Sequence, residues 1–429
     1  MELFQQLGSE IEGLWRDKNY NEDEFPAMAA DALGRANLPS KLSAWDVVAW
    51  SLGETELPPQ RDVYAKFADP PITIYSGPRF HIDVYFWFEG TTAIHQHGFC
   101  GAFQVLMGSS IHSWYDFEQR IPVNTFASIG DMKLKVCELL EVGAVQPILA
   151  GRQYIHSLFH LDYPSATIVV RTDKSPLHLP QFSYEKPFLA IDPFFEQNTT
   201  IKKLQMMSTL FRAGRPEADA SVAKMLDETD LQTSYMILAQ VRHMMKSNQL
   251  SEMFNPDAAK ARFSTFLDIV ARRHGEAGEA MRPVFERYDV LDDIVLRRTY
   301  VTNAEHRFFM ALLLNVEGRD RIFGLIKQRF QNAEPLEKVL DWVFDLSQTR
   351  VVGFESSNAL GIADFGEAEM FALECLLQDK TDEEIVAACL AEAPDADTTV
   401  VTAAMDKLRS SPLFQPLLYK KRDIIPAPI

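Results

Sequence analysis

Cysteine is scarce in this sequence, and its spacing excludes several common uses of the residue. The 429 residues include only four cysteines, which lie far apart and form no C-x-x-C pair. They are Cys100, Cys137, Cys375 and Cys389. In a chain of this length, such cysteines are typical of reduced thiols in a cytosolic protein. We therefore expect free thiols and a cytoplasmic location.

Positive charge is also in short supply. The chain has 42 Lys and Arg against 60 Asp and Glu, a net charge of -18, and its pI is about 5.0. Nucleic acids and anionic membranes bind clustered Lys and Arg, and no basic cluster interleaved with aromatic residues occurs. No apolar run approaches the roughly 18 residues of a membrane span, and the N-terminus lacks the basic start of a signal peptide. We expect a protein that binds neither nucleic acid nor membrane.

Three regions of the chain differ in the spacing of their apolar residues. Residues 1–60 show helical spacing. In residues 61–190, β-branched and aromatic residues form short runs between Gly, Pro, Asn and Asp, which is typical of strands. Residues 195–429 return to helical spacing. This order predicts a multidomain α+β protein with short N-terminal helices, a β-barrel or sandwich, and a large all-α C-terminal domain.

The end of the helical region has a pattern of its own. Residues at about 365–420 are spaced as three consecutive helices, and Thr381 with Glu384 forms a capping box. Three such helices resemble a winged-helix-like unit, which we predict there. The helical domain as a whole would form a homodimer interface, cover the barrel mouth or bind a protein partner.

Histidines are concentrated in the predicted β region. Seven of the ten fall between His81 and His178. His95 and His97 are two residues apart on a strand, so their side chains point into the same space. A third candidate, His156, lies on a later strand in G-R-Q-Y-I-H-S-L-F-H. This spacing favours a metal held by three imidazoles.

The predicted strand before the histidine pair has polar and aromatic residues on one face and apolar residues on the other. In H-I-D-V-Y-F-W, His81, Asp83, Tyr85 and Trp87 share one face, and the residues between them are apolar. The polar and aromatic face fits the lining of a site. Gly101 follows the pair, and glycine in a strand often marks a bulge or the close approach of a ligand.

These residues carry a resemblance to the cupin superfamily. Gly90–Gly108, with its His-x-His, resembles the first cupin motif, and Gly151–His160 resembles the second, with His156 as its ligand. The usual first motif also has a glutamate, and Gly101 stands in its place. A three-histidine cupin without that glutamate is similar to cysteine dioxygenase and related thiol dioxygenases. The stretch W-F-E-G-T-T-A-I-H-Q-H is also similar to that family.

The resemblance covers about residues 70–175 and implies a cupin (double-stranded β-helix) barrel with an iron site. Its metal ligands would be His95, His97 and His156. Fe(II) is the metal that it implies, while Zn, Ni, Mn and Cu stay open because neutral imidazoles suit them as well. A substrate pocket would lie beside the ligands. We assign to this pocket Asp83, Trp87, Phe99, Gln104 and His160.

The sequence departs from the thiol dioxygenases where that family binds cysteine. The early arginine that grips the substrate carboxylate is missing from I-T-I-Y-S-G, and the family's Ser-His-Tyr triad matches Thr167, Val169 and Arg171. We therefore predict an oxygenase for a small thiol or thiol-containing peptide other than free cysteine. Tyr85 and Arg171 are the predicted catalytic residues, because a hydroxyl and a guanidinium group would orient an anionic substrate.

Two other functions fit the same residues. One is a non-redox metal cupin, a lyase, isomerase or hydrolase, in which metal-bound water is the nucleophile. The other is a sensor or scaffold that binds a protein partner through its helices. An enzyme should have an open pocket beside the histidines, whereas a scaffold should have that space filled by Trp87, Phe99 or Phe103. We expect Cys100 to point away from the site, and His112 to point outward or towards the helical domain.

Overall fold

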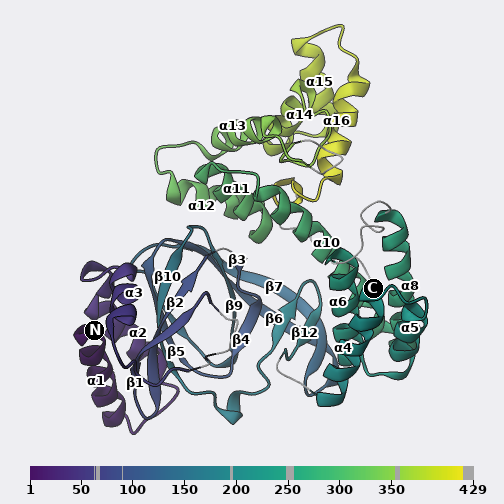
Figure 1. Ribbon diagram of the computed structural model, residues 1–429. Helices are drawn as coiled ribbons and strands as arrows, with labels where there is room; N and C mark the ends of the chain where they lie inside the picture. The colour runs from purple at the N-terminus through teal and green to yellow at the C-terminus, as the bar shows by residue number, and fades with distance from the viewer. Residues whose placement is uncertain are drawn as a thin grey trace.

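The computed structural model begins with a small layer of helices. It describes residues 1–61, 63, 68–88, 90–193, 197–247, 256–352 and 358–418. The elements before the first strand are α1 (Glu2–Asp17), α2 (Phe25–Ala36), the 3-10 turn η1 (Leu38–Ser40) and α3 (Ala44–Gly53). Ser43 and Asp46 form a capping box at the start of α3. The three helices lie together on one side of the β region (Figure 1).

The first sheet is antiparallel and has the strand order β1-β2-β10-β5-β8. Its strands are β1 (Pro71–Ser76), β2 (Phe80–Trp87), β5 (Gly101–Met107), β8 (Val145–Ile148) and β10 (Ser165–Thr172). On one face of the sheet, Ile82, Ile168 and Val170 share an apolar core with Phe4 and Phe25 of the N-terminal helices. Alternation along each strand turns the remaining side chains to the opposite face.

The second sheet closes on itself. Its strands are β3 (Gly90–Thr91), β4 (Ile94–His97), β6 (Ser110–Asn124), β7 (Ala127–Leu140), β9 (Gly151–His160), β11 (Ser183–Glu185) and β12 (Leu189–Ile191), with a 3-10 turn η2 (Pro176–His178) before β11. The order is β3-β9-β4-β11-β12-β7-β6, and β9 also pairs with β6. All of these strands except β3 therefore form an antiparallel ring. Tyr115, Ile155 and Tyr184 belong to an apolar cluster formed by strands of this ring.

The two sheets face one another across a separate apolar space. Tyr85, Phe103 and Val169 of the first sheet form one cluster with Tyr154 and Leu158 of the second. The face of β2 that was expected to line a site therefore points between the sheets. This inter-sheet space, which is distinct from the apolar cluster of the ring, is where the candidate site lies.

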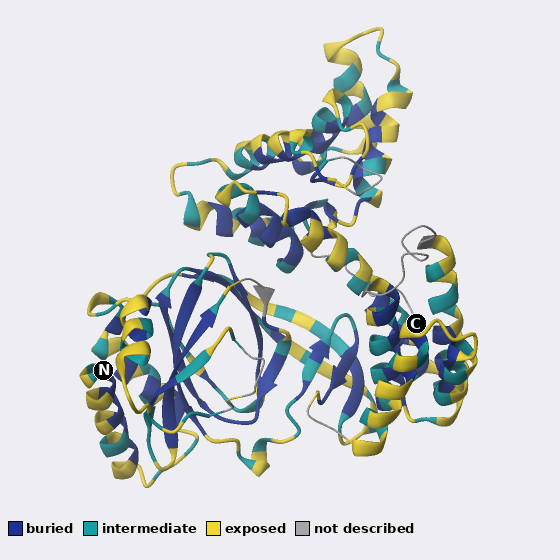
Figure 2. Ribbon diagram, in the orientation of Figure 1, coloured by how far each residue is buried: buried dark blue, intermediate teal, exposed yellow. Residues whose placement is uncertain are grey.

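The helices after the last strand form two apolar cores. The first core is built by α4 (Asn198–Arg212), α5 (Ala218–Glu228), α6 (Leu231–Ser247), α8 (Pro256–His274), α9 (Glu276–Glu279) and part of α10 (Met281–Arg298). The second includes α11 (Ala304–Asn315), α12 (Arg319–Arg329), α13 (Pro335–Gln348), α14 (Glu367–Leu377), α15 (Asp382–Glu392), α16 (Thr398–Ser410) and α17 (Gln415–Leu418). Figure 2 shows the buried side of the helices within each group.

α10 belongs to both helical cores. Val284 and Phe285, near its start, pack in the first core, and Ile294, near its end, packs in the second. Figure 1 shows α10 running from one group of helices to the other. Both cores also include residues of the second sheet, such as Ile129 in the first and Phe159 in the second. The helices are therefore packed directly against the β region.

The fold class predicted from the sequence is confirmed. Short N-terminal helices, an antiparallel β-barrel region and a large helical region follow one another along the chain. Helices α14, α15 and α16 lie where three helices were expected, and the capping box of Thr381 and Glu384 is present. Between α14 and Leu418 the structure has no strand that would form a wing. Of the helices it describes, none has the length and apolar character needed to cross a membrane.

We expect the second helical core to depend on Phe309. This side chain on α11 is 0% exposed, so Phe309→Ala should lower the free energy of unfolding by about 3–5 kcal/mol. Phe344→Ala on α13 is the matched control. Phe344 is 54% exposed, and its truncation should change stability by less than about 0.5 kcal/mol. Urea denaturation followed by circular dichroism measures both changes, and equal losses would contradict this description of the core.

Candidate metal centre

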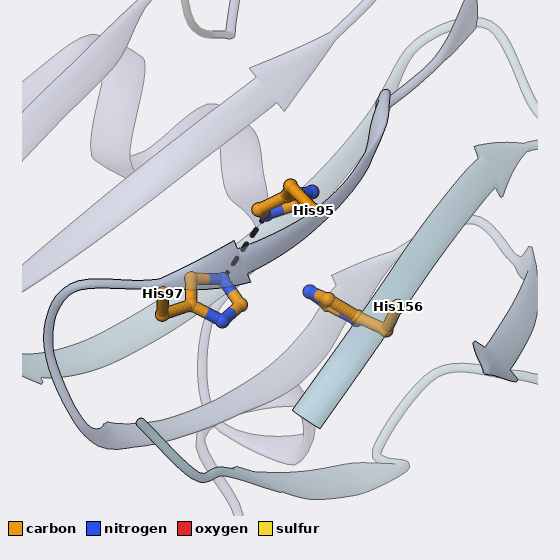
Figure 3. A group of neighbouring side chains, drawn as sticks. All are labelled: His95, His97 and His156. Atoms are coloured by element: carbon orange, nitrogen blue, oxygen red, sulfur yellow. Dashed lines mark hydrogen bonds between the residues drawn. The ribbon is translucent and has the colours of Figure 1, made fainter. Parts of the chain in front are cut away.

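Two neighbouring strands bring the three predicted ligands together. His95 and His97 lie on β4, His156 lies on β9, and the antiparallel pairing of these strands sets His95 directly opposite His156. The register shifts by a bulge between His95 and His97. All three side chains are buried. Figure 3 shows their rings turned towards one another from the two strands.

The spacing of the ring nitrogens fits coordination of one metal ion. One potential ligand atom from each histidine lies within 4.8 Å of the other two. The Nε2 atoms of His95 and His97 are 3.1 Å apart. Two nitrogens at about 2.1 Å from a metal and at right angles to each other would be about 3.0 Å apart. The Nε2 atom of His156 is buried and has no hydrogen-bond partner among the described residues, which also fits a metal ligand.

The three imidazoles are held in their neutral form. Burial lowers the pKa of His95 and outweighs its backbone hydrogen bond, which acts in the opposite direction. Burial, and then the charge of His95, takes the pKa of His97 well below its usual value, and the pKa of His156 is lowered in the same way. A neutral imidazole keeps the lone pair that a metal requires. The chemistry of the donor set therefore matches its geometry.

A backbone hydrogen bond sets the tautomer of His95. Its Nδ1 lies 2.7 Å from the carbonyl oxygen of Ala93. A carbonyl can only accept, so Nδ1 carries the proton and donates it, and Nε2 presents its lone pair to the other histidines.

A chain of polar groups, which begins at the partly exposed Glu138, reaches His156 from the other side. Nδ1 of His156 lies 3.3 Å from Nε2 of His112, and Nδ1 of His112 lies 2.8 Å from a carboxylate oxygen of Glu138. The hydroxyl of Tyr154 is 2.9 Å from the same Nε2 of His112. Because the carboxylate accepts from Nδ1 of His112, the Nε2 of His112 accepts in turn, and His156 donates from Nδ1. This leaves Nε2 of His156 free to bind a metal.

The position of His112 differs from the prediction. We expected it to point outward or towards the helices, but it is 1% exposed and contacts Tyr154 and His156 in the inter-sheet space. The reason is that β6 pairs with β9, with Trp114 opposite His156, so alternate residues of β6 share its face. The sequence alone does not reveal Glu138 or Tyr154 as members of this chain. Glu138 pairs with His112 across β6 and β7.

A second polar group faces the histidines from the first sheet. The carboxylate of Asp83 accepts hydrogen bonds from Thr73 Oγ1 at 2.8 Å, Tyr85 at 3.3 Å and Nε of Arg171 at 3.2 Å. Nε2 of His81 also lies 3.3 Å from Asp83. Burial acts to raise the pKa of Asp83, but its interactions with His81 and then Arg171 outweigh burial, and the net shift is downward. The predicted catalytic residues Tyr85 and Arg171 thus share one ionised carboxylate.

The ring of Phe99 connects Arg171 to the three-histidine cluster. Its guanidinium group is 4.9 Å from the centre of the Phe99 ring, and that ring is 4.7 Å from the ring of His97. The charge of Arg171 contributes to the lowered pKa of His97, after burial and His95. Phe103 packs on the other side, 6.4 Å from the ring of His156. Two of the three side chains that were expected to fill a scaffold's site therefore contact the cluster.

Trp87 and His160 lie together and away from the ligands. Their rings stack at 4.5 Å, and Trp87 donates a hydrogen bond to Thr167 at 3.2 Å. Burial lowers the pKa of His160 to about 3, and its Nδ1 bonds to the hydroxyl of Ser165. His160 is four residues beyond His156, roughly 13 Å along the strand at about 3.3 Å per residue. It is not part of the group of ligand atoms within the described residues.

Gln104, a residue that we assign to the pocket, lies on the other face of β5 from the inter-sheet space. It lies on β5 between Phe103 and Val105, which point into the inter-sheet space. Alternation therefore turns Gln104 to the other face, with Ala102 and Leu106, which pack against the N-terminal helices. Its Nε2 donates to the backbone carbonyl of Gly143 at 3.3 Å. Cys100 lies in that same core, away from the ligands as predicted.

Gly101 explains why the ligand set has no glutamate. Gly101 lies on β5 opposite Arg171 of β10. A Cβ atom at this position would be 2.0 Å from the carbonyl oxygen of Val170 and 2.9 Å from Cα of Arg171. These are backbone atoms of a paired strand, so they cannot move aside alone. The close approach of β5 to β10 thus leaves no room for a side chain at Gly101.

No family model matches the chain. No curated protein matches it either. Among solved structures, it is similar to the dimethylsulfoniopropionate (DMSP) lyase DddQ from Ruegeria pomeroyi DSS-3, with 15% identity and a TM-score of 0.21 over 42% of this chain and 95% of that one. These values describe a distant likeness.

Two further solved structures are similar at the same level. One is Rru_A2000 from Rhodospirillum rubrum, a cupin-2 domain, with 10% identity and a TM-score of 0.19 over 35% of this chain and 81% of that one. The other is hydroquinone 1,2-dioxygenase from Sphingomonas sp. TTNP3, with 12% identity and a TM-score of 0.20 over 29% of this chain and 83% of that one. The assignment to the thiol-dioxygenase type stays a prediction.

Replacing Gly101 should damage the barrel rather than repair the ligand set. Because Cβ would collide with Val170, Gly101→Ala should lower the free energy of unfolding by about 1–3 kcal/mol or more, and Gly101→Glu should behave at least as badly. The control is Gly13→Ala on α1, where nothing lies within 4 Å of the new Cβ. It should be neutral or stabilise by up to about 1 kcal/mol. A melting temperature for Gly101→Ala equal to that of the wild type would show that the strands can separate here.

Glu138 should matter for metal affinity through His112. Glu138→Leu removes the acceptor that sets the tautomer of His112, and losses of about 10–100-fold in metal affinity are usual for such partners. Glu138→Gln keeps an acceptor oxygen and should retain most of the affinity. Glu141→Leu, at an exposed position, is the control. Titration of Zn(II) and Fe(II) against a competing chelator measures all three, and unchanged affinity in Glu138→Leu would exclude this role.

Proposed function

We propose that the protein is a non-haem Fe(II) oxygenase of the thiol-dioxygenase type, acting on a small thiol or a thiol-containing peptide other than free cysteine. The observation that supports it most is a cluster of three neutral histidines in which Gly101 leaves no room for a carboxylate ligand. The metal centre would be held by His95, His97 and His156. Iron in this position would supply the redox chemistry for adding oxygen to sulfur.

The charge of the site favours an anionic substrate. Three neutral ligands leave the charge of a divalent ion uncompensated. Asp83 is the nearby carboxylate on the first sheet, and it is already bonded to Arg171, Tyr85 and Thr73. A thiolate would therefore be stabilised beside the histidines more than a neutral thiol would.

The first sheet would orient the substrate. Asp83 holds Tyr85 and Arg171 through hydrogen bonds, and Arg171 stacks on Phe99 next to His97. A guanidinium group in this position suits a carboxylate or a peptide carbonyl of a bound thiol. Phe99 and Phe103 would exclude water from the reacting groups, which strengthens electrostatic interactions there.

A second candidate function is a sensor or scaffold. The observation that favours it is the packing of Phe99 against His97 and of Phe103 near His156, which leaves less space for a substrate than an open pocket would. A non-redox metal cupin is a further alternative, because the same three nitrogens suit Zn(II). Metal content and oxygen dependence together separate the three functions.

Metal analysis of protein purified without tag or chelator tests the site directly. We expect close to one equivalent of iron in the wild type and at least a tenfold loss in His97→Ala, because one of three ligands is removed. His178→Ala is the matched control, since His178 bonds to Glu22 on the surface, and it should keep its iron. The absence of any transition metal from the wild type would contradict both metal-dependent functions.

Oxygen uptake then tests the proposed reaction. The iron-loaded protein should consume oxygen with cysteamine or with short peptides bearing cysteine, and only weakly with free cysteine. Asp83→Asn should reduce this rate, because it weakens the hold on both Tyr85 and Arg171. Iron-loaded protein that consumes no oxygen with any thiol would contradict the oxygenase and favour a non-redox or scaffold function.

A further inference from the structure

A large cavity lies where the second sheet meets the helices, lined by residues other than the histidine cluster. Its volume is about 900 Å³, which is within the range of small-molecule sites. The walls come from β7, from the turn between β11 and β12, from helices α8, α9, α10 and α11, and from the residues around the start of α17. The cavity is therefore built by all of the main parts of the chain except the N-terminal helices and the first sheet.

Most of the cavity wall is apolar. Met132 and Phe188 contribute from the second sheet, and Leu291, Ile294 and Leu313 contribute from α10 and α11. Phe188 belongs to the first helical core, and Ile294 and Leu313 belong to the second. A ligand here would bury an apolar body against side chains that are already fixed by these cores.

Two cations that line the cavity, Lys186 and Arg287, act on one carboxylate of its wall, Glu317. Three cations, Lys186, Arg287 and Arg321, act together on a single carboxylate, Glu317, and outweigh burial to lower its pKa. Lys186 is bonded to that carboxylate at 2.5 Å. Arg321 is bonded to the backbone carbonyls of Glu317 and Leu134 at 3.1 and 3.3 Å. One carboxylate thus faces three positive side chains.

Of these three cations, Arg287 is the one without a hydrogen bond to Glu317 or to its backbone. Its side chain lines the cavity from α10, and the structure gives it no hydrogen bond or ion pair with any described residue. Burial lowers the pKa of Arg287, and the nearby charge of Glu317 acts in the opposite direction without a hydrogen bond between them. The Arg287 side chain is half-buried, and a charge that is partly removed from water is stabilised by a counter-charge that reaches it.

The other carboxylates that line the cavity do not form an ion pair with Arg287. Asp268 is bonded to Arg282 at 2.6 Å, and Asp131 is 3.5 Å from Arg120. Glu279 is exposed. Asp268 is thus paired with Arg282 and Glu279 faces solvent, while Oδ1 of Asp131 is buried without a hydrogen-bond partner among the described residues.

We propose that this cavity binds an organic anion with an apolar body, whose carboxylate pairs with Arg287 while its chain or ring lies against Leu291, Ile294 and Phe188. A guanidinium group and a carboxylate form two parallel hydrogen bonds, which gives such a site both affinity and orientation. The site goes beyond the proposed oxygenase function and needs no metal.

Decanoate is a suitable probe of the cavity. Isothermal titration calorimetry should show saturable binding of decanoate to the full-length protein, and the ligand should raise the melting temperature. Decanol has the same chain without the charge, and decyltrimethylammonium has the opposite charge. Both should bind at least about tenfold more weakly, the effect of one charge-assisted hydrogen bond.

Three variants assign the binding to Arg287. Arg287→Met keeps an unbranched side chain without the charge and should weaken decanoate at least about tenfold, whereas Arg287→Lys should retain part of the affinity. Arg272→Met is the matched control, because Arg272 pairs with Asp227 outside the cavity, and it should bind as the wild type does. Leu291→Trp should reduce binding of both decanoate and decanol by filling the apolar part.

The result can contradict the proposal in two ways. If folded wild-type protein shows no saturable decanoate binding, the cavity does not take such anions. If Arg287→Met, with an unchanged melting temperature in the absence of ligand, binds decanoate as well as Arg272→Met does, Arg287 is not its counter-charge. Removal of the metal should leave decanoate affinity unchanged, so this test stands whether or not the protein is an oxygenase.

Discussion

The pairing of β4 with β9 is the constraint on which the metal centre depends. It sets His95 opposite His156, and β6 then continues the sheet with Trp114 opposite His156. A shift of one residue in any of these registers would turn a whole strand over. The imidazoles would then face the apolar cluster that includes Tyr115 and Tyr184. The metal ligands and the chain from Glu138 thus depend on hydrogen bonds between backbones.

The parts of the site that follow from local spacing could be predicted. His95 and His97 share a face because side chains alternate along a strand, and the same rule places Asp83 and Tyr85 together on β2. The switch from strand to helical spacing also gave the order of the three regions. These features need only a few neighbouring residues, and the cupin resemblance joined His156 to them.

The parts that depend on distant pairing could not be predicted. His112 faces the ligands only because β6 lies beside β9, and Glu138 reaches it only because β7 lies on the other side of β6. Gln104 is the opposite case, since its parity relative to Phe103 would have excluded it from the pocket. The backbone that would collide with a side chain at Gly101 belongs to β10, some seventy residues later along the chain. Two helical cores in place of one likewise arise from packing that spacing does not record.

The sharing of α10 between two cores has a mechanical consequence. Two groups of helices joined by a flexible loop would be free to melt one after the other. Here the helix is continuous from Met281 to Arg298, a rod of roughly 27 Å at about 1.5 Å per residue. Fraying at either end removes packing from a different core, so each group resists the loss of order in the other. The packing of the two groups of helices is thereby linked through one continuous element.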